Sequence, residues 1–511
     1  MSSQAIGSRV GAAAVSAATA RSAELRLVVA IVIPVLVTIV ASRISTVAFV
    51  GAALVSVVAL AYVCFRAPRA MLVTLALAPL VDRYLVRLVV PADVQPFANM
   101  LTEALLVMLG AAIFVHGRRS GRLLPALRHP SVVCMAIFAG LAAASALVNG
   151  VPPAVAGLGT LYTIDAFMLF LLARVIGFDD RAATRAAGAF AALAVLAALL
   201  DLGQVVLAPD ILGLAVFTGR FGEGLRPGSF FAAQPNLLGA VLGMAMPLAT
   251  FAAVRPGIGR VRRGAFVAAA FLLALALLYT FSRGTWLALA VATVVTGLLL
   301  DRRVIGLTAV LGGLALATAL ILPRGILLGP NSPWAIDLGN AIFGRLGAIG
   351  EGNDLRFRFI ANGVPIVVDH PLLGTGPGTY GGAVAARFGS PLYERYTAGQ
   401  VPLERTVDNY WLHLLVESGI PGAALVAGAL GVAIMQSLRA ARGAQATRRV
   451  LLAAFAGAGT VLAFDSLTEM LLEGNTTSFP VWFLLGLATL LAARPSPPPE
   501  AVEAAPPSAR G

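Results

Sequence analysis

The chain has 511 residues, of which 59% are hydrophobic and 12% charged, whereas roughly a quarter of an ordinary soluble domain is charged. This composition excludes a water-soluble enzyme, and the long apolar runs exclude a disordered chain. The net charge is +13, and all 37 positively charged residues are arginines. They cluster between the apolar runs, a pattern typical of membrane orientation and not of nucleic-acid binding.

Fourteen apolar runs approach the roughly 20 residues that a helix needs to cross the hydrocarbon of a membrane. They predict an all-α fold, a polytopic bundle of about 12–14 transmembrane helices, with one large extracytoplasmic loop that carries short helices. In chain order the runs lie at residues 27–41, 46–64, 70–90, 98–115, 131–148, 157–176, 186–208, 229–253, 264–281, 284–300, 304–322, 409–437, 450–470 and 478–493.

The arginines between these runs predict the orientation. With the N-terminus in the cytoplasm, 24 of the 37 arginines fall on the inner side and 13 on the outer side, as the positive-inside rule requires. We therefore expect a multi-pass protein of the cytoplasmic (inner) membrane. Its expected parts are a cytoplasmic tail at 1–26, eleven helices within 27–322, an extracytoplasmic loop at 323–408, three helices within 409–493 and a disordered cytoplasmic tail at 494–511.

Few residues suit metal or cofactor chemistry. The chain has two cysteines and four histidines, so we expect neither a disulfide framework nor a metal site. The sequence GTGPGT at residues 374–379 lacks the third glycine of a dinucleotide fingerprint, and no strand is expected before it. It is more typical of a turn.

The first motif is a tight break between two apolar runs at residues 281–287, FSRGTWL. An arginine at this depth, Arg283, is costly to desolvate unless it has an anionic partner. The alternative is an arginine that reaches to the membrane surface beside an aromatic belt to which Trp286 contributes.

The second motif lies in the expected outer loop, which holds seven of the thirteen outward arginines against the bias of the remaining chain. Residues 355–380 predict a short helix with Arg356, Arg358 and His370, followed by a Gly/Pro turn. These residues form either a solvated cap or a site for an anionic group.

The third motif, residues 408–422, is a helix start followed by a Gly/Pro break. Asp408 or Asn409 is suited to be a helix N-cap. Glu417 lies about 12 Å below Asp408 if the helix is continuous, and an acid within a membrane is functional by default. His413 can pair with Glu417 because they are four residues apart. Alternatively, the first part of this segment lies along the outer surface and the crossing starts after the break.

Together the motifs resemble the O-antigen ligase and O-antigen polymerase superfamily of bacterial polytopic membrane glycosyltransferases, over the region from about Arg220 to Gly422. Residues 220–236, RFGEGLRPGSFFAAQPN, resemble the segment with a Pro-Asn pair before a helix. Arg283 stands at the arginine of the arginine-x-x-x-leucine motif. Arg356 precedes a His-Pro pair by fourteen residues, as the family's loop arginine does, although Ile360 replaces the usual tryptophan.

The last match has one departure. Asp408-Asn409, nine residues, Gly419, two residues and Gly422 resemble the His-Asn-x9-Gly-x-x-Gly motif. The family's ligases have histidine where this chain has Asp408, and that histidine is proposed as the base that activates the acceptor hydroxyl. A carboxylate can do the same if its pKa is raised. The resemblance therefore leaves both ligase and polysaccharide polymerase open.

The resemblance implies an enzyme of cell-envelope biogenesis that moves a glycan from a polyprenyl-(pyro)phosphate donor to an acceptor hydroxyl at the outer face of the cytoplasmic membrane. It implies no metal, nucleotide sugar or other cofactor. The implied partners are the lipid-linked donor, a glycan, lipid or protein acceptor and membrane lipids, without nucleic acid. The implied catalytic residues are Asp408, Arg283 and Arg356, and the candidates for substrate binding are Arg220, Arg226, Arg358, His370, Asn409, Trp286, His413 and Glu417.

The competing hypothesis is a secondary transporter or permease for an anionic solute or a glycan. Transporters place ionisable groups or broken helices near the middle of the bilayer. Asp201 and Asp465 lie within apolar runs and favour this class, whereas a long outer loop that holds the motifs favours the transferase.

Overall fold

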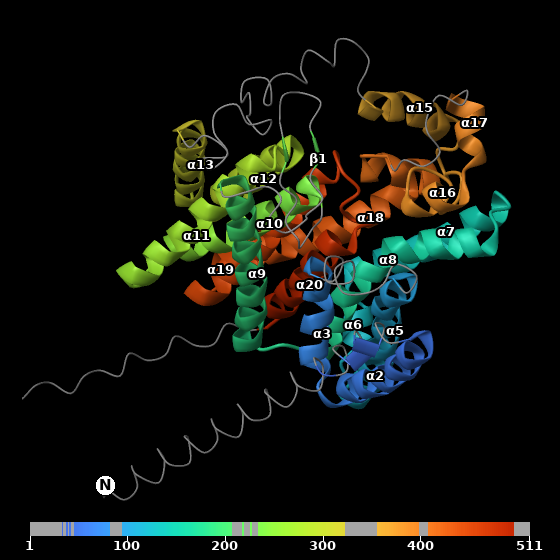
Figure 1. The fold of residues 1–511 in the computed structure, drawn as a ribbon, viewed down its shortest axis with the longest axis horizontal. Helices are drawn as coiled ribbons and strands as arrows, with labels where there is room; N and C mark the ends of the chain where they lie inside the picture. The colour runs from blue at the N-terminus through green and yellow to red at the C-terminus, as the bar shows by residue number, and fades with distance from the viewer. Residues whose placement is uncertain are drawn as a thin grey trace, which may run out of the picture.

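The structure is a computed structural model that describes residues 45–81, 95–206, 217–218, 225–226, 234–321, 355–397 and 407–494, together with a few residues between 33 and 41. Nearly all of these residues are helical, as the composition predicts (Figure 1). The exception is one short antiparallel pair, β1 (Phe217–Thr218) and β2 (Leu225–Arg226), in which Phe217 faces Arg226.

Helices follow one another from residue 46 to residue 492 of the described ranges. In chain order they are α2 (Thr46–Arg66), α3 (Pro68–Leu77), η1 (Ala78–Leu80), α5 (Gln95–Arg119), α6 (Leu123–Leu127), α7 (Pro130–Val148), α8 (Pro153–Ile176), α9 (Asp180–Val206), α10 (Pro235–Val254), α11 (Arg260–Tyr279), α12 (Arg283–Leu299), α13 (Arg303–Ile321), α15 (Leu355–Asp369), α16 (Ala383–Phe388), α17 (Pro391–Thr397), α18 (Tyr410–Gly443), α19 (Ala446–Asp465) and α20 (Asn475–Ala492).

Within the described ranges, nine helices are long and apolar enough to cross a membrane, namely α7, α8, α9, α10, α11, α13, α18, α19 and α20. This finding confirms a multi-pass helical bundle. The runs expected at 46–64 and 70–90 form α2 and α3, which are bent by 119° across Ala67, and α3 itself is only ten residues long. The run at 284–300 is α12, which has 17 residues. The run at 27–41 lies mostly outside the described residues.

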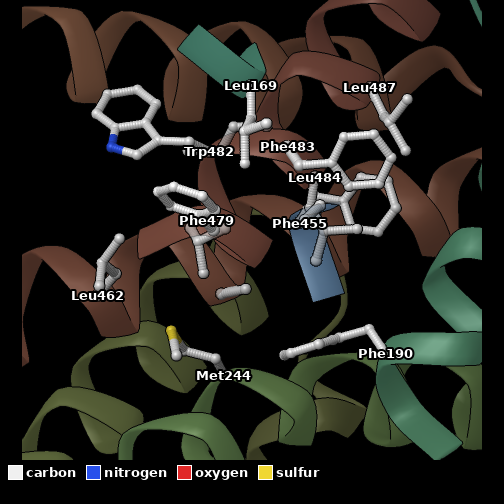
Figure 2. Close-up of a cluster of buried hydrophobic side chains, with 14 of the residues drawn as sticks. Leu169, Phe190, Met244, Phe455, Leu462, Phe479, Trp482, Phe483, Leu484 and Leu487 are labelled. Carbon is white, nitrogen blue, oxygen red and sulfur yellow. The ribbon is translucent and has the colours of Figure 1, made fainter. Parts of the chain in front are cut away.

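The centre of the bundle is made by α10, α19 and α20, of which most residues are buried, whereas α11 and α13 are largely exposed at its edge. A helix that is apolar all round is suited to such a central place. In Figure 2, side chains of α19 and α20 meet those of α8, α9 and α10. The aromatic rings interlock here, because Phe167 packs edge-to-face on Trp482 with ring centroids 5.1 Å apart.

Small residues let the backbones of the central helices approach closely. Close packing drives helix association in a membrane, because lipid tails are as apolar as leucine side chains and the hydrophobic effect contributes little. A Cβ atom on Gly486 of α20 would lie 2.7 Å from the carbonyl oxygen of Phe170 in α8. The contact between α8 and α20 therefore depends on a residue without a side chain.

A second, smaller core lies beside α18, where α15, α16 and α17 gather (Figure 1). These are the short helices that the sequence predicts for the loop. The core consists of Phe359, Ile366, Tyr380, Tyr393, Val407, Leu412 and Val416. It fixes the loop segment 355–397 against the first part of α18.

We predict that Gly486→Val separates α8 from α20 and destabilises the protein by at least about 1–3 kcal/mol, because the neighbouring atoms are backbone and cannot turn aside. Gly431→Val in α18 is the matched control, since no atom lies within 4 Å of its added Cβ. Thermal unfolding of the two variants in detergent measures the difference. Equal midpoints would contradict the tight α8–α20 contact.

Candidate active site

The break before α12 is built on a strained residue. Phe281 is buried and has a φ of 52°, the one positive φ outside glycine among the residues described. Such a conformation costs on the order of 1–3 kcal/mol and tends to occur at functional sites. It lets the chain turn within three residues, because α11 ends at Tyr279 and α12 begins at Arg283. Arg283 is half-buried at this helix start.

The start of α12 is tied to the end of α19 by a buried carboxylate. The Thr285 hydroxyl donates to Asp465 Oδ2 at 2.5 Å, and the Thr468 hydroxyl donates to Asp465 Oδ1 at 3.0 Å. Gly284 packs directly against this pair, because an added Cβ would lie 2.7 Å from Asp465 Oδ1. Asp465 therefore fixes the place of Arg283, two residues before Thr285.

The start of α18 is held by hydrogen bonds at three residues on either side of Asp408. The Val407 N–H donates to the Gly381 carbonyl at 2.8 Å, the Asn409 side chain caps the helix by accepting from the Leu412 N–H at 3.0 Å, and the Tyr410 N–H donates to the Ser466 carbonyl at 2.9 Å. The N-cap is thus Asn409. Asp408 is half-buried between a buried Val407 and a buried Tyr410.

Arg283 and Asp408 are therefore brought to the same end of the bundle. Arg283 is two residues before Thr285, which binds Asp465, and Asp408 is two residues before Tyr410, which binds Ser466. Asp465 and Ser466 are neighbours at the end of α19. The end of α19 therefore binds both motifs, although Arg283 and Asp408 are 125 positions apart in the sequence.

The helix that starts at Tyr410 is broken at Gly419, which has φ 66° and ψ −178°. Pro421 has no N–H to donate back to Glu417, and the Ile420 N–H turns to the Pro371 carbonyl at 2.9 Å. The carbonyls of Val416 and Glu417 consequently lose their helical donors. The continuous helix considered from the sequence is not what forms.

Residues 371–382, which we call the turn loop, supply the missing donors. The Thr375 N–H reaches the Val416 carbonyl at 2.9 Å, and the Gly376 N–H reaches the Glu417 carbonyl at 3.0 Å. Gly376 and Gly378 have φ values of 103° and 79°, which only glycine adopts readily. The GTGPGT sequence is thus a turn, as predicted, and it caps the break in α18.

Glu417 and His413 complete the attachment of the turn loop. The Gly378 N–H donates to Glu417 Oε2 and the Tyr380 N–H to Oε1, both at 2.8 Å. His413 Nδ1 lies 2.5 Å from the Tyr380 carbonyl, so this nitrogen carries the proton, and His413 Nε2 is 3.6 Å from Glu417 Oε2. Both side chains are buried. They act structurally here, and their contact with a substrate stays a prediction.

The α15 helix carries the loop arginines. Arg356 lies in its first turn, and one turn later the Phe359 carbonyl accepts from the Tyr380 hydroxyl at 3.0 Å. Phe359 and Val407 belong to the same small core, so the backbone at Arg356 is placed in the region of Asp408. Arg358 is exposed.

The remaining candidates are spread around this end. His370 is half-buried after α15. The Trp286 ring N–H donates to the Leu277 carbonyl at 3.1 Å and thereby ties α12 to α11. Arg226 lies in β2, and Arg220 lies outside the described residues.

The two buried phenols of the small core are unsuited to be bases. Burial raises the pKa of Tyr393 to about 12 and also raises the pKa of Tyr380. Both hydroxyls stay protonated at neutral pH. Tyr393 instead accepts from the Gly381 N–H at 2.7 Å.

The sequence reasoning missed the acidic connector between α19 and α20, residues 465–474. Glu469 accepts from the Asn236 side chain at the start of α10, and Glu473 accepts from the Ala383 N–H at 2.9 Å. Their four-residue spacing after Asp465 was the available signal. Within the described ranges, no group of three or more His, Cys, Asp or Glu side chains is arranged to hold a metal ion.

Comparison with known families gives one match. Residues 268–427 match the family model of O-antigen ligase, a segment that runs from α11 into α18 and contains Arg283, Arg356 and Asp408. No curated protein matches the chain. The family match confirms the resemblance to the O-antigen ligase superfamily over this segment.

We predict that Glu417→Ala destabilises the protein by about 1–3 kcal/mol for each of the two buried N–H groups that lose their acceptor. Glu417→Gln keeps one acceptor oxygen, so its stability should lie between that of Glu417→Ala and that of the wild type. Thermal unfolding in detergent measures this order. If Glu417→Ala unfolds at the same temperature as the wild type, the structural role of Glu417 is contradicted.

Proposed function

We propose that this membrane protein, with its O-antigen ligase segment at residues 268–427, transfers a glycan from a polyprenyl-pyrophosphate donor to an acceptor hydroxyl at the outer face of the cytoplasmic membrane. The observation that carries the proposal is the attachment of the Arg283 and Asp408 segments to consecutive residues, Asp465 and Ser466. This places a cation and a carboxylate at one end of the bundle.

Arg283 is suited to bind the pyrophosphate. A guanidinium offers two parallel N–H donors to phosphate oxygens. Arg283 is also the first residue of α12, where the partial positive charge of the helix start attracts anions. The negative charge that develops on the departing pyrophosphate is stabilised by donors already in place. Arg356 supplies the second guanidinium of this clamp.

Asp408 is suited to take the acceptor proton. The acceptor oxygen attacks the anomeric carbon of the donor sugar, the bond from that carbon to the pyrophosphate oxygen breaks, and its electron pair leaves on the pyrophosphate. The proton of the acceptor hydroxyl passes to the Asp408 carboxylate. Because Asn409 caps α18, Asp408 does not serve as that cap.

The transporter hypothesis loses one of its supports. It depends on ionisable groups in the middle of the bilayer, but Asp465 is the last residue of α19 and binds two hydroxyls next to the α12 break. Asp201 is near the end of α9. Both carboxylates lie toward helix ends.

We predict that Arg283→Lys and Arg356→Lys each lower glycan transfer by roughly 100-fold, because lysine keeps the charge but loses the bidentate fork. Transfer is measured as polymerised or ligated glycan in membranes that contain lipid-linked donor. Arg387→Lys, an exposed arginine in α16, is the control. Equal activity of the three variants would contradict the proposal that Arg283 and Arg356 bind the pyrophosphate.

Asp408→Asn should lower transfer by roughly 100-fold or more if Asp408 is the base. Asp408→His should retain part of the activity, since the imidazole of the family's ligases would then stand at this position. Asp369→Asn is the control, because Asp369 is an exposed carboxylate that accepts from the Tyr396 hydroxyl. Wild-type activity in Asp408→Asn would move the search for the base to Glu473 or His370.

The outward face of the site can be tested separately. In a variant with Cys64→Ala and Cys134→Ala, we expect Phe388→Cys, which is exposed in α16, to react with an impermeant maleimide in intact cells. Arg262→Cys, exposed at the start of α11, should react only after lysis. The reverse pattern would place the site on the cytoplasmic face.

A further inference from the structure

A concave site lies at the opposite end of the bundle from Arg283 and Asp408. It is a hollow of about 580 Å³, within the rough range of 300–1,000 Å³ for ligand sites. The beginnings of α9 and α19 and the end of α10 frame it. Because α19 ends at Asp465 and begins at Ala446, the hollow is one full helix length from the candidate active site.

Positive charge dominates the hollow. Arg181, Arg185, Arg255 and Arg448 line it, with Asp180 as the one acidic residue. The buried Arg448 is already matched, since its Nε and Nη2 atoms each donate to an Asp180 carboxylate oxygen at 3.1 Å. Counted together, four arginines against one aspartate give the lining of the hollow a net positive charge.

Two features supply hydrogen-bond donors for an anion. Arg255 Nε is buried and finds no acceptor among the described residues, which is costly for a guanidinium N–H. The first residues of α19, Ala446 and Thr447, also line the hollow, and the Gln445 side chain does not cap that helix. An oxygen-rich anion matches both features.

We propose that this hollow binds the phosphate group of an anionic phospholipid. The three helix ends that frame it belong to membrane-spanning helices, so the hollow lies where lipid head groups lie. The adjoining α11, which contacts α9 and α10, exposes Val261 at 89% and Phe266 at 37%. These side chains offer an apolar surface for the acyl chains of the same lipid. The proposal does not depend on the proposed transfer reaction.

The test uses the full-length protein in detergent, with native mass spectrometry to measure the binding of phosphatidylglycerol and, as the zwitterionic reference, phosphatidylcholine. We expect the wild type to prefer phosphatidylglycerol. Arg185→Gln and Arg255→Gln should each weaken that binding roughly fivefold, which is about 1 kcal/mol per arginine. Arg128→Gln is the matched control, since Arg128 is exposed before α7 and outside the hollow.

Unchanged phosphatidylglycerol binding in the Arg185→Gln Arg255→Gln double variant would overturn the proposal. So would full displacement of the lipid by millimolar inorganic phosphate, because the hollow would then be a site for a soluble anion. Thermal unfolding in phosphatidylcholine alone shows whether each variant is folded. If the double variant is unfolded, the exposed single variant Arg185→Gln decides the outcome by the same criterion.

Discussion

A helix that breaks inside a membrane protein must give its freed peptide groups new partners, because lipid cannot hydrogen-bond to them. In this chain the break at Gly419 frees two carbonyls, and the turn loop supplies the N–H groups that they need. The Glu417 side chain then binds two more N–H groups of the same loop. The position of α15, the small core and the backbone around Asp408 all follow from this exchange.

The acidic connector performs the same task for the other half of the site. Its first residues join α12 to α18, and Glu469 joins it to α10. Four helix starts, those of α10, α12, α18 and α20, therefore meet at one end of the bundle. Helix starts carry a partial positive charge, and the connector's three carboxylates offset part of it. An anionic substrate group at this end would be attracted by the arginines and by the part of the helix-start charge that the carboxylates leave uncompensated.

Most of the membrane helices can be predicted from hydropathy. The geometry of the candidate site cannot, because it depends on contacts between segments that are distant in the sequence. Apolar runs and break residues predicted α7 to α13 and α18 to α20 closely. The break between the runs at 46–64 and 70–90 was predicted as well, and Pro68, a favoured first residue of a helix, marks where the second helix begins. The angle of 119° between the two helices was not predicted.

Arg283 and Asp408 were placed on one side by topology alone. The structural attachment of Glu417 could not be anticipated, because its partners Gly378 and Tyr380 lie almost 40 residues earlier and bind through backbone atoms that any sequence has. Asp465 was noticed only as an acid within an apolar run. Its partners, Thr285 and Thr468, depend on the packing of α12 against α19, which no local pattern specifies.

The turn loop has a consequence for the rigidity of the end of the molecule that carries α15. Its amide hydrogens at Thr375, Gly376, Gly378 and Tyr380 all point into α18, so an irregular segment is as firmly fastened as a helix. Slow exchange of these amides with solvent would accompany the slow exchange of α18 itself. The α15 helix, the turn loop and the first part of α18 are thus fastened to one another, and this holds the backbones at Arg356 and Asp408 at one spacing.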